Sequence, residues 1–232
     1  MRYPGGKGRC YQHIISLMPP HRVYVETHLG GGAVLRHKRP AQESFGVEKD
    51  ALVVSRWAGR TPGGMTLVHG DALEFLDGFR FVGDELVYCD PPYPRETRSH
   101  AAGRPYRHDY VHKDHVELLN RLRKLPCAAM VSSYDNDLYA EALRDWRVVR
   151  FAGDSHAGPR TETVWMNFPE PPVLHDYDHI GGDFRGRERQ RRRRGGLSRR
   201  IGEMPALERG ALFHDLARRF GPELRAVLDA VP

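Results

Sequence analysis

Four short apolar runs, each closed by an acidic residue, constrain the fold of this 232-residue chain more than any other feature. Segments with the apolar spacing of helices lie between these runs, and strands that alternate with helices are typical of a mostly parallel sheet covered on both faces. Two later runs, 146–151 and 161–168, are expected to be closing antiparallel strands. The sequence therefore predicts one α/β domain over residues 1–170. The four acids are Glu26, Glu48, Asp71 and Asp90.

The ends of these predicted strands have the composition of a nucleoside site. Open parallel sheets bind ligands at the carboxyl ends of their strands, and here three glycines, 30–32, would let a ligand approach the backbone. Glu48 follows the first strand end by about 20 residues, the spacing at which an acid reaches a ribose. The full G-x-G-x-x-G pattern is missing, and nothing marks a pyrophosphate site. A phosphate-free, cationic nucleoside such as S-adenosylmethionine suits the acids best.

The fourth run continues into Asp90-Pro91-Pro92-Tyr93. Two prolines fix the backbone and remove N–H donors, so the free groups of this segment are hydrogen-bond acceptors. Acceptors at a carboxylate and a rigid carbonyl can hold an exocyclic amino group and favour positive charge on its nitrogen. The ring of Tyr93 could stack on a base turned out of its helix. The segment therefore predicts a catalytic site for an amino group.

These motifs resemble those of the Dam-type DNA adenine methyltransferases. Residues 90–93 match the D-P-P-Y of that family, "VETHLGGGAV" resembles its cofactor motif, and "RYPGGKG" resembles its N-terminal aromatic-x-Gly-Gly-Lys. The resemblance covers Arg2 to Phe168. It implies a class I methyltransferase fold, S-adenosylmethionine as cofactor, and DNA methylated at the 6-amino group of adenine. The residues that it implies in cofactor binding are Tyr3, Lys7, Glu26, Gly30, Gly32, Glu48 and Asp71, and those in catalysis are Asp90, Pro91, Pro92 and Tyr93.

The sequence departs from the family pattern in two places. Thr27 and His28 stand where the family usually has Pro-Phe, which removes the expected phenylalanine. Only 18 residues separate Asp71 from Asp90, whereas Dam itself carries a target-recognition insertion there. The target must then be read elsewhere, and the loop after Tyr93 and a distal arginine-rich segment are the candidates. The residues expected to contact nucleic acid are Arg95, Arg98, Arg104, Tyr106, Arg107, Arg191, Arg192, Arg193 and Arg194.

The arginine-rich segment holds nearly all the excess positive charge. Residues 185–200 contain nine arginines and one glutamate, while the other 216 residues carry 27 basic and 29 acidic side chains. Such a local run favours a polyanion partner, nucleic acid above all. We expect residues 171–202 to be a linker and arginine-rich arm, and residues 203–232 to be a small helical tail with apolar stripes.

Three cysteines without C-x-x-C spacing, and an N-terminus without a secretory pattern, favour a cytoplasmic protein. No metal is expected, because His112 and His115 lack further ligands nearby. Two alternatives to DNA adenine methylation stay open. One is methylation of adenine or of the cytosine amino group in RNA, and the other is a non-catalytic nucleic-acid-binding protein on a methyltransferase scaffold.

Overall fold

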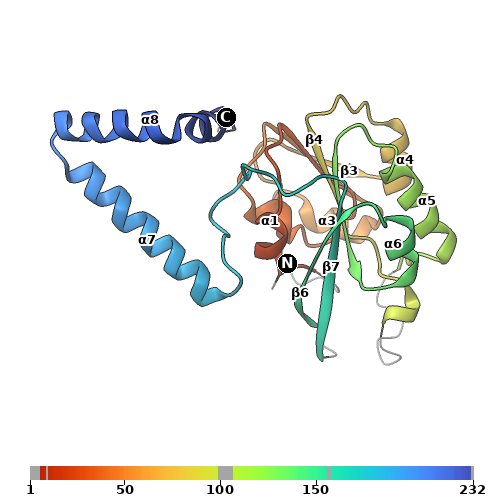
Figure 1. The fold of residues 1–232 in the computed structure, drawn as a ribbon. Coiled ribbons are helices and arrows are strands. Elements are labelled where there is room, and N and C mark those ends of the chain that lie inside the picture. The colour runs from red at the N-terminus through yellow and green to blue at the C-terminus, as the bar shows by residue number, and fades with distance from the viewer. Residues whose placement is uncertain (1–5, 9, 99–106, 156–157, 231–232) are drawn as a thin grey trace.

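The computed structural model describes residues 6–8, 10–98, 107–155 and 158–230, and the expected site residues Tyr3, Arg104 and Tyr106 lie outside this part. It contains one seven-stranded sheet in the order β3-β2-β1-β4-β5-β7-β6 (Figure 1). The first five strands pair in parallel, and β7 runs antiparallel to both β5 and β6. The strands are β1 Val23–Glu26, β2 Glu43–Glu48, β3 Met65–His69, β4 Glu85–Cys89, β5 Ala128–Tyr134, β6 Arg147–Ser155 and β7 Gly158–Met166.

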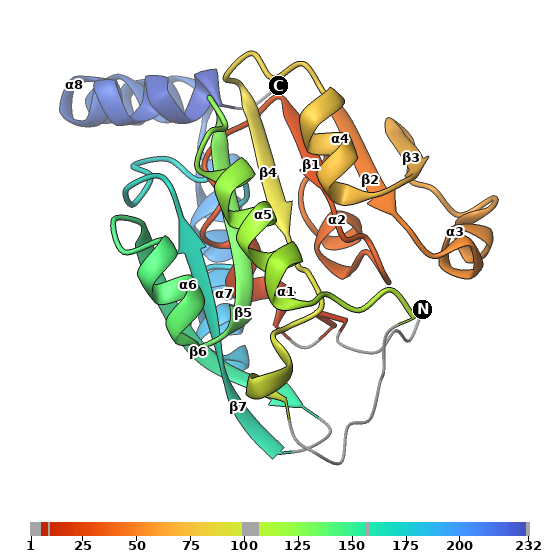
Figure 2. The same cartoon turned by 90° about the vertical axis from the view of Figure 1, so that its right-hand side faces the viewer.

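Helices cover both faces of the sheet, as the sequence predicted. Three helices contribute to the core on one face and three to the core on the other (Figure 2). Residues alternate between the two cores along β4, where Leu86 and Tyr88 face one and Val87 and Cys89 face the other, because successive side chains of a strand point to opposite faces. The helices of the first face are α1 Tyr11–Ile15, α2 Ala33–His37 and α3 Ala51–Trp57; those of the second are α4 Ala72–Gly78, α5 His112–Leu122 and α6 Asp137–Ala142. A short 3₁₀ turn, η1, spans Arg95–Thr97.

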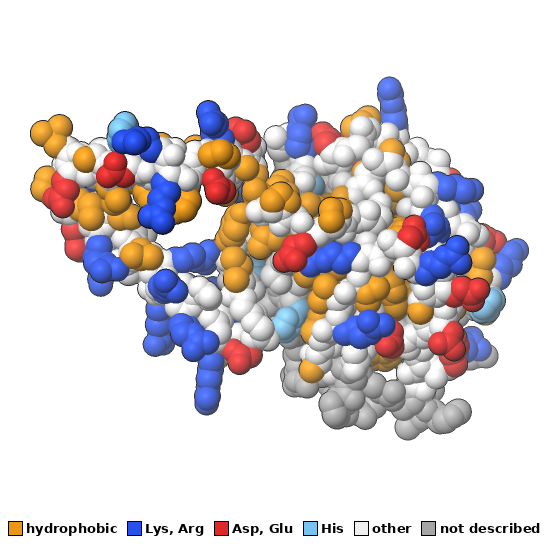
Figure 3. Space-filling view, in the orientation of Figure 1, with side chains coloured by type: hydrophobic (Ala, Val, Ile, Leu, Met, Phe, Trp, Pro, Cys, Tyr) orange, Lys and Arg blue, Asp and Glu red, His pale blue; other side chains and the backbone are white. Residues whose placement is uncertain are grey.

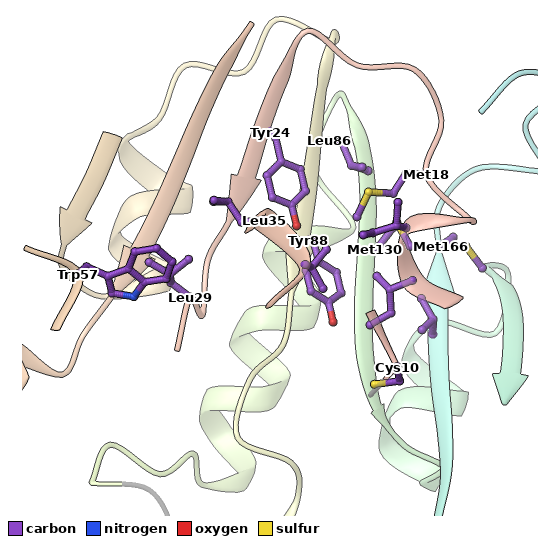
Figure 4. Close-up of a cluster of buried hydrophobic side chains, with 14 of the residues drawn as sticks. Cys10, Met18, Tyr24, Leu29, Leu35, Trp57, Leu86, Tyr88, Met130 and Met166 are labelled. Carbon is purple, nitrogen blue, oxygen red and sulfur yellow. The ribbon is translucent and has the colours of Figure 1, made fainter. Parts of the chain in front are cut away.

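The glycine turn after β1 is shaped by its contacts with the first core. Gly30 and Gly32 have φ angles of 47° and 57°, which glycine adopts readily. A Cβ atom on Gly32 would lie 2.5 Å from the ring of Trp57, and Figure 4 shows that ring beside Leu29. The indole Nε1 of Trp57 also donates to the Gly30 carbonyl at 3.0 Å. Glycine is therefore required at position 32 by both backbone conformation and space.

Beyond the sheet, two long helices project from the domain (Figure 1). They are α7, Phe184–Glu203, and α8, Ala206–Asp229, and neither contains a buried residue. The helical tail is confirmed, and the arginine-rich run is also a helix. α8 is kinked at Phe220, directly before Gly221-Pro222, where a proline removes a helical hydrogen bond.

The segment before α7 packs against the domain, although its composition suggested a plain linker. His175 and Asp176 are buried. The His175 amide donates to the Met18 carbonyl at 3.0 Å, and the Asp176 carboxylate accepts from the Arg39 amide at 2.8 Å. Arg39 also donates to the Ala230 carbonyl at the end of α8. The predicted boundary at residue 170 therefore cuts off a part that packs on the domain.

Candidate active site

A pocket lies at the carboxyl edge of the parallel strands, where the sequence placed it. The acids that follow β2, β3 and β4 border it together with the glycine turn after β1. Its lining consists of Thr27, His28, Gly30, Glu48, Lys49, Asp50, Gly70, Asp71, Ala72, Asp90, Pro92, Arg107, His108 and Tyr110.

Glu48 joins the glycine turn to the end of β2. Its two carboxylate oxygens accept from the amides of Gly30 and Asp50, each at 2.8 Å. Burial raises the pKa of Glu48, and these amide hydrogen bonds act in the opposite direction. The carboxylate is thus fixed at the pocket wall, with further lone pairs available for ligand hydroxyls.

Asp71 begins α4 and borders the same pocket. One carboxylate oxygen caps the helix by accepting from the amides of Leu73 and Glu74, and the other accepts from Lys49 Nζ at 2.8 Å. Burial alone would raise the pKa of Asp71, but Lys49 and the helix amides outweigh it and lower the pKa. Asp71 therefore stands in the pocket as a carboxylate.

Glu26 does not border the pocket, which corrects its expected cofactor contact. It is buried beneath α2, where Oε2 accepts from the Tyr24 hydroxyl and the Leu35 amide, both at 3.0 Å. Burial, with Asp90 adding to it, raises the pKa of Glu26 to about 8 despite these hydrogen bonds. Its side chain supports the start of α2 from within the core.

Asp90 follows β4 and is held from one side only. Its Oδ1 accepts from Lys7 Nζ at 2.5 Å and from the Ser132 hydroxyl at 3.0 Å. Among the described residues, no donor is assigned to Oδ2, and the side chain borders the pocket with Pro92. Because one oxygen is anchored, the other can serve as an oriented acceptor for a ligand. Pro91 joins these two pocket residues in the chain, and its carbonyl stays a predicted acceptor.

Lys7 contacts the Asp90 carboxylate from behind the pocket and is not itself among the lining residues, which differs from its expected contact with the cofactor. Its ammonium lies between Asp90 and Glu162, with Glu162 Oε1 at 3.3 Å. Burial would lower the pKa of Lys7, but the two carboxylates outweigh it and raise the pKa above its ordinary value. Lys7 is therefore a buried cation that neutralises part of the negative charge of Asp90 and Glu162.

Tyr93 does not stand where it could stack on a base. It is 9% exposed, its hydroxyl donates to Glu162, and its ring makes a T-shaped contact with Tyr134 at 4.7 Å between centroids. The Lys7 ammonium lies 4.8 Å from the centre of the ring. These contacts hold Tyr93 inside the protein, so the stacking role expected from the sequence is not met in this structure.

Thr27 and His28 form a polar chain on the pocket wall. Thr27 Oγ1 donates to Cys89 Sγ at 3.0 Å, so it accepts from His28 Nδ1 at 2.9 Å. His28 Nε2 is then the acceptor of the Tyr110 hydroxyl, at 2.9 Å. This chain leaves lone pairs on the Tyr110 oxygen and makes His28 a neutral ring in place of the family's phenylalanine.

Burial lowers the pKa of His28 to about 3, which gives His28→Phe a pH-dependent effect. Below pH 6.5 the unfolded wild type takes up a proton at His28 and the folded wild type does not, so the wild type loses stability that the variant keeps. When the pH is lowered from 7.5 to 5.5, the difference in unfolding free energy between the variant and the wild type should change by about 1 kcal/mol in favour of the variant. Urea denaturation at both pH values measures this, and a constant difference between the two proteins would contradict it.

The arginines after Tyr93 differ in their availability. Arg98 is enclosed, since it donates to both oxygens of Asp109 and to the Tyr93 carbonyl. This corrects its expected role in binding phosphate. Arg95 lies 3.4 Å from Asp109 and its side chain is 53% exposed, whereas Arg107 borders the pocket. Arg107 is thus the one arginine among the described residues of this loop that lines the pocket.

The four arginines expected to bind nucleic acid on α7 are exposed, and basic side chains follow this helix in Figure 3. Arg191 and Arg192 lie 3.4 and 4.0 Å from Glu188. Arg194 instead donates to the Tyr177 carbonyl and to Asp178, which fixes α7 to the segment before it. Arg191, Arg192 and Arg193 are therefore better placed for phosphate contacts than Arg194.

Several residues in or beside the site carry no specific signal in the sequence. Ser132 is a small polar residue within the apolar run of β5, and Tyr110 is one aromatic of the basic loop after Tyr93. Glu162 had a weak signal, as an acid within an otherwise strand-like run. Their roles depend on contacts between residues far apart in the sequence.

Comparisons with known proteins show similarity at the level of fold. No family profile matches the sequence, and no curated protein matches it. The 23S rRNA methyltransferase ErmE is 12% identical, with a TM-score of 0.48 over 82% of this chain and 84% of its own. A dimethyladenosine transferase from Plasmodium falciparum is 11% identical, with a TM-score of 0.44 over 71% and 62%. The spermidine synthase from Thermotoga maritima is 15% identical, with a TM-score of 0.43 over 68% and 59%.

The order and direction of the seven strands decide the fold class. The fold is that of the class I methyltransferases. The names of the three similar proteins describe different reactions. The chemistry of this chain must therefore be argued from its own pocket.

The pocket lining is rich in hydrogen-bond acceptors, which suits the hydroxyl groups and the positive charge of S-adenosylmethionine. Four carboxylates border it, from Glu48, Asp50, Asp71 and Asp90, against the basic side chains of Lys49 and Arg107. Such a lining favours hydroxyl donors and positive charge over phosphate. Within the part of the chain that is described, no helix is long and apolar enough to cross a membrane, and no group of three or more His, Cys, Asp or Glu could hold a metal ion.

Proposed function

We propose that the protein is an S-adenosylmethionine-dependent methyltransferase that acts on the 6-amino group of adenine in DNA. The observation that carries this proposal is the arrangement of Asp90, which borders the acidic pocket with one oxygen anchored and the other without a hydrogen-bond donor among the described residues. An acceptor of this kind holds an amino group and favours the positive charge that develops on its nitrogen.

Different residues bind the cofactor and hold the amino group in this reaction. Glu48 and Asp71 bind hydroxyl and amino groups of the cofactor. Gly30 and Gly32 have no side chains, so the cofactor can approach the backbone of the turn closely. Asp90 Oδ2 and the Pro91 carbonyl accept the hydrogens of the adenine amino group and direct its lone pair toward the methyl group. When bound, the cofactor supplies an electrophilic methyl on a sulfonium. Orientation and electrostatics supply the rate, because the amino proton can leave after transfer.

The basic α7 supports a nucleic acid as the substrate. Its arginines other than Arg187 are exposed, whereas the remainder of the chain is close to neutral. Adenine in RNA is the second candidate, because the segment between Asp71 and Asp90 consists of α4 and β4 with connecting turns and holds no separate recognition domain for duplex DNA.

Labelled methyl transfer tests the proposal. Purified protein with tritiated S-adenosylmethionine is offered unmethylated duplex DNA, single-stranded DNA and RNA in separate reactions, and the labelled nucleoside is identified by mass spectrometry. We expect N6-methyladenine in DNA. Label in RNA alone would overturn the choice of DNA, and transfer to none of the three polymers would overturn the proposed activity.

A further inference from the structure

Glu162 is a buried acid that the proposed reaction does not use. It lies on β7, opposite Tyr134 of β5 and Phe151 of β6, and is 5% exposed. An ionised carboxylate in the interior of a sheet is costly unless it is paired or hydrogen-bonded. Its position therefore calls for a reason beyond packing.

Two partners hold Glu162 beside the catalytic segment. Its Oε1 accepts from the Tyr93 hydroxyl and lies 3.3 Å from Lys7 Nζ. The same ammonium lies 2.5 Å from Asp90 Oδ1. Lys7 is thus shared between two carboxylates, and the side chains of Lys7 and Glu162 are each only 6% exposed.

The charges of this group do not cancel. Burial raises the pKa of Glu162, and the nearby Lys7 ammonium acts in the opposite direction. With both acids ionised, Asp90 and Glu162 contribute two negative charges and Lys7 one positive charge, and no further ion pair to either acid is found in the described residues. Asp90 alone would have formed a neutral pair with Lys7. With Glu162 present, Lys7 is shared between the two acids, so the group as a whole keeps one net negative charge, and its Asp90 end borders the pocket.

We propose that Glu162 is a positioning residue which, through Lys7, keeps the Asp90 side of the pocket negative and makes the site prefer S-adenosylmethionine to S-adenosylhomocysteine. This inference rests on the proposed function and deepens it. Methyl transfer breaks the carbon–sulfur bond with its electron pair going to sulfur, forms a nitrogen–carbon bond, and releases the amino proton to solvent. The cofactor therefore changes from a cationic sulfonium to a neutral thioether. A negatively charged pocket binds the sulfonium more strongly than the thioether.

Glu162→Gln tests this charge effect, because it keeps the shape and the acceptor for Tyr93 but removes the negative charge. Binding of S-adenosylmethionine and of S-adenosylhomocysteine is measured by calorimetry without any nucleic acid. The ratio of the two dissociation constants should shift by roughly fivefold to tenfold toward the neutral ligand. Glu162→Asp, which keeps the charge, should leave the ratio close to that of the wild type.

A double variant separates charge from structure. Lys7→Met with Glu162→Gln leaves Asp90 as the one ion of the group, so the net charge returns to that of the wild type and the ratio should return with it. Glu85→Gln is the matched control, since Glu85 is also a buried glutamate of the sheet, but among the described residues its carboxylate accepts from the amides of Val82 and Gly83 at the opposite end of β4. Thermal unfolding of each variant reports whether it is folded, and the double variant serves if Glu162→Gln alone does not fold.

Each outcome decides one of the two proposals. An unchanged ratio in Glu162→Gln, even with both affinities lowered equally, would refute the charge effect and leave the proposed function in place. The charge effect would also be refuted if the ratio of the two dissociation constants shifted further in the double variant than in Glu162→Gln. Failure of the wild type to bind either ligand would instead overturn the proposed function.

Discussion

Replacement of Asp90 by alanine should lower the rate of methyl transfer by at least about 10³-fold, because the variant loses the acceptor that orients the amino group and stabilises its developing charge. Affinity for S-adenosylmethionine should fall far less, since Glu48 and Asp71 border the pocket independently of Asp90. Single-turnover methylation measures the rate, and calorimetry with the cofactor measures the binding.

Asp84→Ala is the control for this variant, since Asp84 immediately precedes β4 at the end of the strand away from the pocket. Its rate should match that of the wild type. If Asp90→Ala retained more than about a tenth of the wild-type rate, Asp90 would not hold the reacting amino group.

Neutralisation of three arginines on α7 is the second change with a large expected effect. Arg191, Arg192 and Arg193 replaced together by glutamine should weaken nucleic acid binding by about 10- to 100-fold near 0.1 M salt, because each lost phosphate contact removes a released counterion. The slope of log affinity against log salt should become shallower by about 2 to 3. Fluorescence anisotropy over a salt series measures both quantities.

The neighbouring helix provides a control with the same change in charge. α8 carries four arginines and four acids, and replacing Arg218, Arg219 and Arg225 by glutamine should leave affinity and slope within about twofold of the wild type. Equal losses in the two triple variants would mean that only the total charge matters and that α7 is no specific contact surface.

The sequence predicted the parallel sheet and the position of the pocket because both follow from local patterns. Glu48, Asp71 and Asp90 each stand at or shortly after the end of a short apolar run, and the ends of parallel strands meet at one edge whatever the details of packing. Glu48 and Asp71 could therefore be placed at this edge of the sheet without any knowledge of their partners, and both line the pocket.

The contacts inside the site could not be derived in this way. Lys7 and Asp90 are separated by 83 positions and Tyr93 and Glu162 by 69, so no short-range pattern links them. Tyr93 was expected to face a base because aromatic rings stack well. Its hydroxyl instead donates to the buried Glu162 carboxylate, so the ring lies inside the protein. Arg98 likewise has a strong local partner in Asp109, which sequence composition does not reveal.

The attachment of the tail at both of its ends sets a length scale for binding. Arg39 contacts the segment before α7 and also the end of α8. The two long helices are therefore attached to the domain at both ends of the tail, and α7 is held to one side of it. Its 20 residues span about 30 Å, which equals the rise of about nine base pairs at 3.4 Å each. On a duplex, the protein should therefore give an asymmetric nuclease footprint that extends up to one helical turn further on one side of the methylated base than on the other.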